Sequence, residues 1–219
     1  MTFSICATVD GRHGVAIASH AVAVGSTASH VCRAGAVCTQ ATTSTPLGIH
    51  ATRALERGTP ADKAIQALVA ADDRAPIRQL HAIDADAVGA AHTGADCVEW
   101  AGHRVGERCT AAGNMLEGPD VLEAMLESFE SSTELPLDSR LRRALRAGED
   151  AGGDNRGPRA RSSALAVFDP DTPRLHHDLR VDEHEDAVTE LERLHDVVGE
   201  RGDTLVEAYP GFDPQRHPE

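Results

Sequence analysis

Thr2 is the first residue whose type and position suggest chemistry, because it becomes N-terminal once Met1 is cleaved. Its side chain is small, so we expect methionine aminopeptidase to remove Met1. The exposed threonine would hold a hydroxyl beside a free α-amine, whose pKa of about 8 lets it accept the hydroxyl proton near neutral pH. One residue would then supply both nucleophile and base. The alternative is a chain start that is only anchored in a sheet.

Two further segments contain polar groups suited to an acyl-transfer site. The segment GNML at 113–116 presents Asn114, whose amide, with neighbouring backbone N–H groups, could hold a developing negative oxygen. The alternative is a Gly-Asn turn before a helix. The segment HTG at 92–94 closes an expected strand, so His92 or Thr93 could face a cleft, or could simply satisfy a strand-end turn.

A long glycine-rich, charged segment, GEDAGGDNRGPR, covers residues 148–159. Long loops inside compact domains are usually functional or disordered. Asp154 and Arg156 could grip a polar substrate, Arg being suited to a carboxylate, while a solvated surface loop is the alternative. No GK[ST] follows, so this is not a phosphate-binding Walker loop. Arg78 and Gln79 on an expected strand could be substrate contacts or a buried polar pair.

The sequence contains no metal-binding or disulfide pattern that we can identify. Five cysteines are widely spaced without a CxxC pair, so buried thiols are expected. HVC at 30–32 could offer a histidine and a cysteine to a metal, but this pair alone is a weak indication. The 12 histidines lack HExxH, HxxEH and HxH spacings. We therefore expect neither a metal nor a cofactor.

The elements that must position these residues follow from periodicity and caps. Residues 2–20 are predicted to form a hairpin, because FSICATV alternates and DGR provides a turn. Thr45–Pro46 and Thr59–Pro60 are predicted to cap and open two helices. The other predicted elements are strands at 34–41, 77–84, 87–94 and 162–169, and helices that start near 113–119, end at Gly148 and span 182–198.

Grouped strands and paired helices predict a mostly antiparallel α+β layered domain over residues 1–200, with a tail at 201–219. No stretch of 18 apolar residues and no signal peptide is present, so we expect a cytoplasmic protein without a membrane span. A net charge of -14 with a single lysine, Lys63, is typical of a salt-rich cytoplasm and excludes a basic surface for nucleic acid. A homodimer is a generic expectation.

The order of short segments resembles a known family. MTFSI, GVAIAS, AVG, TQA, RQL, TG, WAG, GNML, AGEDAGGDNRG and SAL occur in the order found in domain of unknown function 1028, over roughly residues 2–195. That family is regarded as similar to N-terminal nucleophile (Ntn) hydrolases, which implies a four-layer αββα sandwich of two mostly antiparallel sheets flanked by helices. HGVAIASHAVAVGS also resembles proteasome-type β subunits. Their acidic residue and lysine are absent here, with Ser19–His20 in the turn, and Arg161 stands where the family is expected to have glutamine.

The residues and the resemblance together favour an Ntn amidohydrolase acting on a small amide or acyl compound. Thr2 would be the nucleophile and Asn114 an oxyanion donor. A non-catalytic protein on the same scaffold, binding a small metabolite or serving as a subunit, is the alternative, and retained Met1 would favour it. A metal hydrolase is disfavoured by the histidine spacings.

Overall fold

The computed structural model describes residues 2–153, 155–170 and 175–201. Within them lie ten strands, five α-helices and two short 3-10 helices. The strands are β1 (Thr2–Val9), β2 (Arg12–Ser19), β3 (Ser29–Cys32), β4 (Gly35–Ala41), β5 (Arg78–Asp84), β6 (Gly89–Thr93), β7 (Ala101–Gly106), β8 (Cys109–Asn114), β9 (Ser162–Phe168) and β10 (Leu175–Val181). The helices are η1 (Val24–Ser26), α1 (Thr45–Glu56), α2 (Ala61–Ala71), η2 (Ala75–Ile77), α3 (Asp120–Ser131), α4 (Leu137–Asp150) and α5 (Ala187–Arg201).

The strands form two sheets, one of six strands in the order β10-β9-β2-β1-β8-β7 and one of four in the order β3-β4-β5-β6. Every strand pair in them is antiparallel. This confirms the expected α+β class with two antiparallel sheets. The first strand, β1, lies in the interior of the larger sheet, between β2 and β8. Thr2 at its start is therefore held by ladder hydrogen bonds from two neighbours, which keeps a terminus from fraying.

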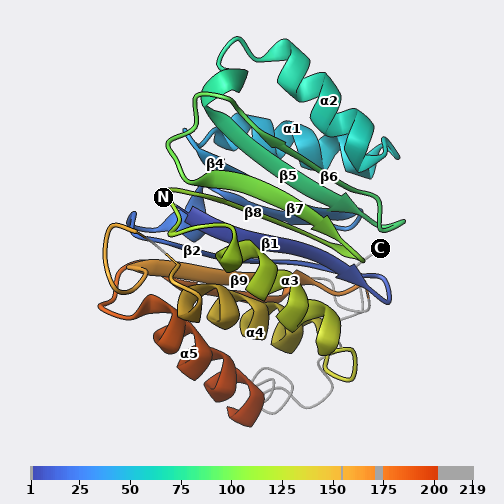
Figure 1. The fold of residues 1–219 in the computed structure, drawn as a ribbon. Coiled ribbons are helices and arrows are strands. Elements are labelled where there is room, and N and C mark those ends of the chain that lie inside the picture. The colour runs from blue at the N-terminus through green and yellow to red at the C-terminus, as the bar shows by residue number, and fades with distance from the viewer. Residues whose placement is uncertain (1, 154, 171–174, 202–219) are drawn as a thin grey trace.

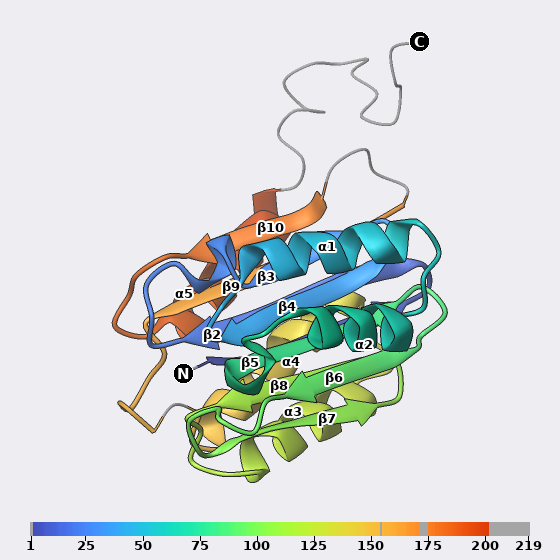
Figure 2. The ribbon, with the colours of Figure 1, turned by 90° about the horizontal axis from the view of Figure 1, so that it is seen from above.

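The two sheets lie face to face, with helices on the outer side of each (Figure 1). The helices α1 and α2 cover the four-stranded sheet, as the view from above shows (Figure 2). On the other side α3, α4 and α5 cover the six-stranded sheet (Figure 1). This arrangement gives each sheet one face toward helices and one toward the other sheet, so alternate residues of a strand enter different layers.

The alternation in β1 shows how the sequence separates the two layers. Phe3, Ile5 and Ala7 are fully buried and pack in the core between the six-stranded sheet and the helices. Ser4 faces the other way, where its Oγ donates a hydrogen bond of 2.7 Å to Oε1 of Gln40 on the four-stranded sheet. Because Thr2 lies two residues before Ser4, its side chain lies on the face toward the other sheet.

Several predicted elements are confirmed. The hairpin expected over residues 2–20 is β1 and β2, joined at Asp10–Gly11 with φ of 51° and 77°, a left-handed pair that suits a tight turn. The two helices opened by prolines are α1 and α2, and the strand pair expected near Asp84 is β5 and β6.

The segment around Asn114 was predicted in part. The helix expected to begin around 113–119 is α3, which starts at Asp120 directly after Pro119. The residues before it were predicted wrongly, because Gly113 and Asn114 are the last residues of β8. The strands β3, β7, β8 and β10 were not predicted. In β8, CTAAGN has small residues on both faces, so it shows no apolar alternation although all six residues are buried.

No helix in the described part of the chain is both long and apolar enough to cross a membrane. The tail expected over 201–219 begins at the last residue of α5, and the rest of it lies outside the described residues.

Candidate functional site

A row of polar side chains crosses the end of the six-stranded sheet at Thr2. Thr2 is paired with Asn114 on β8 and with Ser19 on β2, and Ser19 is paired in turn with Ser162 on β9. Residues directly opposite one another on neighbouring strands have Cβ atoms about 5 Å apart and point to the same face. The four side chains therefore stand side by side on the face toward the other sheet.

The Thr2 hydroxyl already has a hydrogen-bond partner in this row. Its Oγ1 donates to Oγ of Ser19 at 3.2 Å, and Ser19 Oγ also accepts the backbone N–H of Ala21 at 3.0 Å. Thr2 is 7% exposed, so its oxygen is placed by its neighbours rather than by solvent. Such positioning is what a nucleophile needs.

Asn114 is oriented by Gln79, which lies on β5 of the other sheet. Nδ2 of Asn114 donates to Oε1 of Gln79 at 3.0 Å, and this oxygen also accepts from Nε2 of Gln40 at 2.7 Å. An amide nitrogen has two N–H groups. The bond to Gln79 uses one of them, and within the described residues the second has no hydrogen-bond acceptor, so it could donate beside Thr2.

Backbone carbonyls fix the direction of this hydrogen-bond chain. Nε2 of Gln79 donates to the carbonyls of Gly102 and Gly113 at 2.9 and 2.8 Å, and a carbonyl can only accept. Gln79 must therefore turn its oxygen toward Gln40, whose own oxygen accepts from Ser4. Because the Ser4 hydroxyl donates its only proton to Gln40, it can only accept a hydrogen bond from Nε2 of His81, 2.8 Å away. Nε2 of His81 therefore carries a proton.

Four candidate residues lie on β5 and β6, and they point to opposite faces of the four-stranded sheet. Gln79 and Thr93 face the six-stranded sheet, and Oγ1 of Thr93 lies 2.9 Å from Nε2 of Gln79, whose two N–H groups are shared among three acceptors. Thr93 is also 2.9 Å from Nδ1 of His103 on β7. Thr93 thus belongs to the polar chain that includes Asn114.

Arg78 and His92, each of which could have been a substrate contact, do not lie in the row at Thr2. Arg78 forms an ion pair with Asp72 at 2.9 Å and donates to the carbonyl of Thr42. Nε2 of His92 is 3.0 Å from the carbonyl of Ala75. Both follow the alternation of their strands onto the face covered by α1 and α2, so they are structural contacts of that layer.

The segment expected to be a loop at 148–159 begins in the last turn of α4, and the described part of its loop reaches the Thr2 end of the sheet. The backbone N–H of Asn155 donates to the carbonyl of Met115, directly after Asn114, at 3.2 Å. That of Arg161 donates to the carbonyl of Ser19 at 2.8 Å. Arg156 is exposed on this loop, and Asp154 lies outside the described residues. The loop is therefore placed beside the row, as a substrate-binding segment would be.

Glu149, at the end of α4, anchors this loop. Its Oε1 accepts the backbone N–H of Ala160 at 2.8 Å, while Oε2 is buried and has no hydrogen bond within the described residues. Burial raises the pKa of Glu149, and this effect exceeds the opposite effect of the bond from Ala160. A raised folded-state pKa means that its contribution to stability is complete below the unfolded value of about 4.3 and is lost as the pH rises through the folded value.

Glu149→Gln is therefore expected to stabilise the protein at pH 7. Glutamine keeps an acceptor for Ala160 and removes the buried charge. The gain in urea midpoint over wild type should shrink as the pH falls through the raised pKa of folded Glu149, and it should vanish below about 4, where wild-type Glu149 is neutral in both states. Glu127→Gln, at an exposed position on α3, serves as the control and should show no such pH-dependent gain. A Glu149→Gln protein less stable than wild type at pH 7 would contradict this account.

Three buried side chains between the sheets form a second cluster, Cys6, Cys38 and His81, with donor atoms within 4.8 Å of one another. Burial raises the pKa of Cys38, but hydrogen bonds from Cys6 and His81 and the charge of His81 outweigh it and lower that pKa to about 5. Burial raises the pKa of Cys6 well above its usual value. The expected buried thiols are confirmed at Cys6, Cys38 and Cys109.

The comparison with protein families covers most of the chain. The family described as "Family of unknown function (DUF1028)" matches residues 2–191. The chain belongs to the DUF1028 family. A search of curated proteins finds no match.

Among solved structures, the DUF1028 protein SPO2555 from Silicibacter pomeroyi is similar to this chain. The two share 32% sequence identity with a TM-score of 0.84, over 93% of this chain and 88% of the other. Both findings support the resemblance seen in the sequence, and neither assigns an activity.

In this DUF1028 chain, three residues of the site were missed by sequence reasoning: Ser19, Gln40 and Ser162. Gln40 could have been found, because it is a large polar residue on the same face of a strand as Ala36 and Cys38. Ser19 and Ser162 stand at strand ends, where serine is common. Only the strand register brings them to Thr2.

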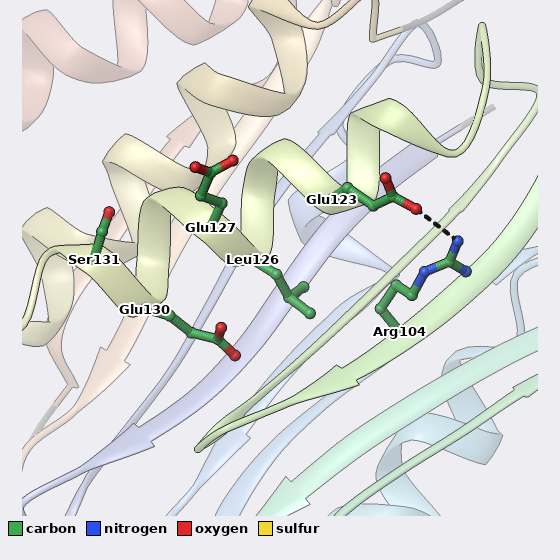
Figure 3. Close-up of a pocket in the computed structure, with 6 residues that line it drawn as sticks. All are labelled: Arg104, Glu123, Leu126, Glu127, Glu130 and Ser131. Carbon is green, nitrogen blue, oxygen red and sulfur yellow. Dashed lines mark hydrogen bonds and ion pairs between the residues drawn. The ribbon is translucent and has the colours of Figure 1, made fainter.

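A hollow of about 480 Å³ lies between α3 and β7 of this DUF1028 chain (Figure 3). Arg104 and Glu123 form an ion pair of 3.1 Å across it, and Glu127 and Glu130 add negative charge. Arg104 is three residues along β7 from Ala101, the partner of Asn114, and it points to the helix layer. This hollow is therefore separate from the row at Thr2.

Proposed function

We propose that the protein is an N-terminal nucleophile amidohydrolase acting on a small amide or acyl compound, with Thr2 as nucleophile. The observation that carries the proposal is the pairing of Thr2 with Asn114 on one side and Ser19 on the other. A hydroxyl, an amide donor and a helper hydroxyl from three strands meet where removal of Met1 would create an α-amine. The two face-to-face sheets with outer helices support the αββα scaffold that the Ntn-hydrolase resemblance implies.

The reaction follows from these groups. The Thr2 α-amine accepts the hydroxyl proton as Oγ1 forms a bond to the substrate carbonyl carbon. The negative charge that develops on the carbonyl oxygen is stabilised by the remaining N–H of Asn114. The ammonium returns its proton to the departing amine as the C–N bond breaks, leaving an ester on Thr2. Water, deprotonated by the same amine, then attacks the ester carbonyl carbon. The ammonium returns its proton to Oγ1 of Thr2 as the bond between Oγ1 and the acyl carbon breaks, which releases the acid and restores the hydroxyl.

The rest of the polar chain holds this arrangement rigid. Gln79 fixes the Asn114 amide, and the carbonyls of Gly102 and Gly113 fix Gln79. Asp154 and Arg156 flank Asn155, the loop residue bonded next to Asn114, and we assign them to substrate binding. A carboxylate-bearing substrate would suit Arg156.

A second candidate, a non-catalytic protein on the same scaffold, is favoured by one observation. Thr2 is only 7% exposed, so a retained Met1 would leave its hydroxyl buried and its amine blocked in a peptide bond. The state of Met1 separates the two candidates.

We predict that purified protein lacks Met1 and that its Thr2 reacts with an epoxyketone, a reagent that requires both the hydroxyl and the amine of an N-terminal threonine. Intact mass spectrometry should show the chain shorter by one methionine, then heavier by one reagent molecule. Acetylating the α-amine beforehand should prevent the reaction and is the control. Two results would favour the non-catalytic candidate: a mass that still includes Met1, or a chain that has lost Met1 but does not react with the epoxyketone.

A further inference from the structure

Asp138, His177 and His195 meet at the end of α4 that is remote from the Thr2 row. They come from three elements, α4, β10 and α5, and their donor atoms lie within 4.8 Å of one another. Gly148 lies near the other end of α4, where an added Cβ would come within 3.3 Å of the ring of Phe3 on β1. Asp138 and Gly148 are ten positions apart in the helix, about 15 Å along the axis. The cluster is thus separate from the proposed catalytic site.

Both histidines direct the same nitrogen at one carboxylate oxygen. Nε2 of His195 is 2.6 Å from Oδ2 of Asp138, and Nε2 of His177 is 3.7 Å from that oxygen. The two imidazole centroids are 5.2 Å apart, with ring planes tilted by 38°. In a tetrahedral centre with bonds of 2.0–2.1 Å, donor atoms lie about 3.4 Å apart. The distances from Oδ2 of Asp138 to Nε2 of His195 and of His177, 2.6 and 3.7 Å, lie on either side of this value.

His177 is the most buried member of the cluster. Its side chain is 9% exposed, and its Nε2 faces the same oxygen of Asp138 that His195 contacts. The side chains of Asp138 and His195 are each 13% exposed. Three ionisable groups kept largely from water, with donor atoms that converge on one point, are the arrangement of a metal site.

The surroundings of His195 fit this arrangement. Its Nδ1 is buried without a hydrogen bond within the described residues, and Oδ1 of Asp196 lies 3.8 Å from it. A histidine that binds a metal through Nε2 carries its proton on Nδ1 and usually offers it to a carboxylate. The carboxylate of Asp196 is placed for that role after a small rotation.

We propose that Asp138, His177 and His195 bind a divalent transition-metal ion, for which Zn²⁺ has the matching ligand preference. Imidazole and carboxylate donors suit this ion, which requires no redox partner. The ion would clamp β10 and α5 to α4, next to the ion pair of 2.7 Å between Arg146 and Glu192 that already joins the two helices. Its role would be structural and independent of Thr2.

The test is Zn²⁺ titration of the full chain after treatment with a chelator. Calorimetry should show one Zn²⁺ per chain, and Zn²⁺ at about 100 times its Kd should raise Tm by roughly 5–10 °C. His177→Gln and His195→Gln should each weaken binding by more than ~100-fold, since even supporting residues around a metal are worth 10–100-fold. His184→Gln, at an exposed histidine between β10 and α5 whose backbone bonds to Arg161, lies away from the cluster and should bind as wild type does.

Cobalt distinguishes this site from the cysteine cluster without relying on any variant. Co²⁺ bound by nitrogen and oxygen absorbs in the visible range without a sulfur-to-cobalt charge-transfer band, which Cys6 or Cys38 would produce. A spectrum without that band supports the proposal. Absence of Zn²⁺ binding, a thiolate band, or undiminished binding in the His177→Gln/His195→Gln double variant would each overturn it.

Discussion

Thr2→Ala is expected to abolish both epoxyketone labelling and amide hydrolysis, lowering turnover by at least ~10⁴-fold, as loss of a nucleophile does in other hydrolases. Alanine is also small enough for Met1 removal, so the α-amine is still produced and only the hydroxyl is lost. The fold should tolerate the change, because Thr2 makes one side-chain hydrogen bond, to Ser19, worth about 1 kcal/mol. Intact mass after labelling and turnover on a panel of small amides and acyl amino acids are the measurements.

Two variants sharpen this test. Thr2→Ser keeps hydroxyl and amine and should retain part of the labelling and turnover. Thr8→Ala removes a buried hydroxyl from the same face of β1, where Thr8 contacts Nδ1 of His13 at 2.8 Å. It should cost stability but leave labelling unchanged. Equal hydrolysis by Thr2→Ala and wild type would show that Thr2 is only the anchored start of a strand.

Gln79→Leu is expected to lower the free energy of unfolding by about 3–5 kcal/mol, the range for breaking a buried polar network. Leucine has a similar size but no polar atoms. The substitution leaves the N–H groups of Asn114 and Gln40 and the carbonyls of Gly102 and Gly113 without their partner. Each buried group left unsatisfied costs about 1–3 kcal/mol, partly recovered by relaxation.

Urea unfolding measures this loss, and Gln66→Leu on the exposed face of α2 is the matched control, expected within about 0.5 kcal/mol of wild type. Gln79→Glu should also destabilise, because a carboxylate cannot donate to the two glycine carbonyls. A loss below about 1 kcal/mol for Gln79→Leu would mean that the chain from Gly113 to His81 adds little to stability and does not hold Asn114 in place.

The sequence alone determined the first hairpin and the class of the fold. Alternation in residues 3–9 and the DGR turn specify β1 and β2, and the two proline-opened helices follow from local capping chemistry. These features are local, so they could be predicted from neighbouring residues. The order of family segments was equally informative, and the family match over residues 2–191 confirms it.

The tertiary structure decided which of the candidate residues meet. Arg78 and Gln79 are adjacent in sequence, as are His92 and Thr93, yet successive strand residues point to opposite faces. In each pair only one residue can face the six-stranded sheet. Only the packing of α1 and α2 on the other face shows which residue that is. Asn114 reaches Thr2 through β8, whose small residues give no periodic signal.

The metal ligands proposed at Asp138, His177 and His195 were likewise invisible to motif spacing, because they stand 39 and 18 residues apart in three elements. Spacing motifs detect ligands that share one helix or loop, whereas a site assembled from α4, β10 and α5 exists only when these elements pack. The sequence therefore determines which groups are available, such as a threonine at position 2. Strand register and layer packing determine which of them lie within reach of one another, because contacts between distant segments depend on the whole fold.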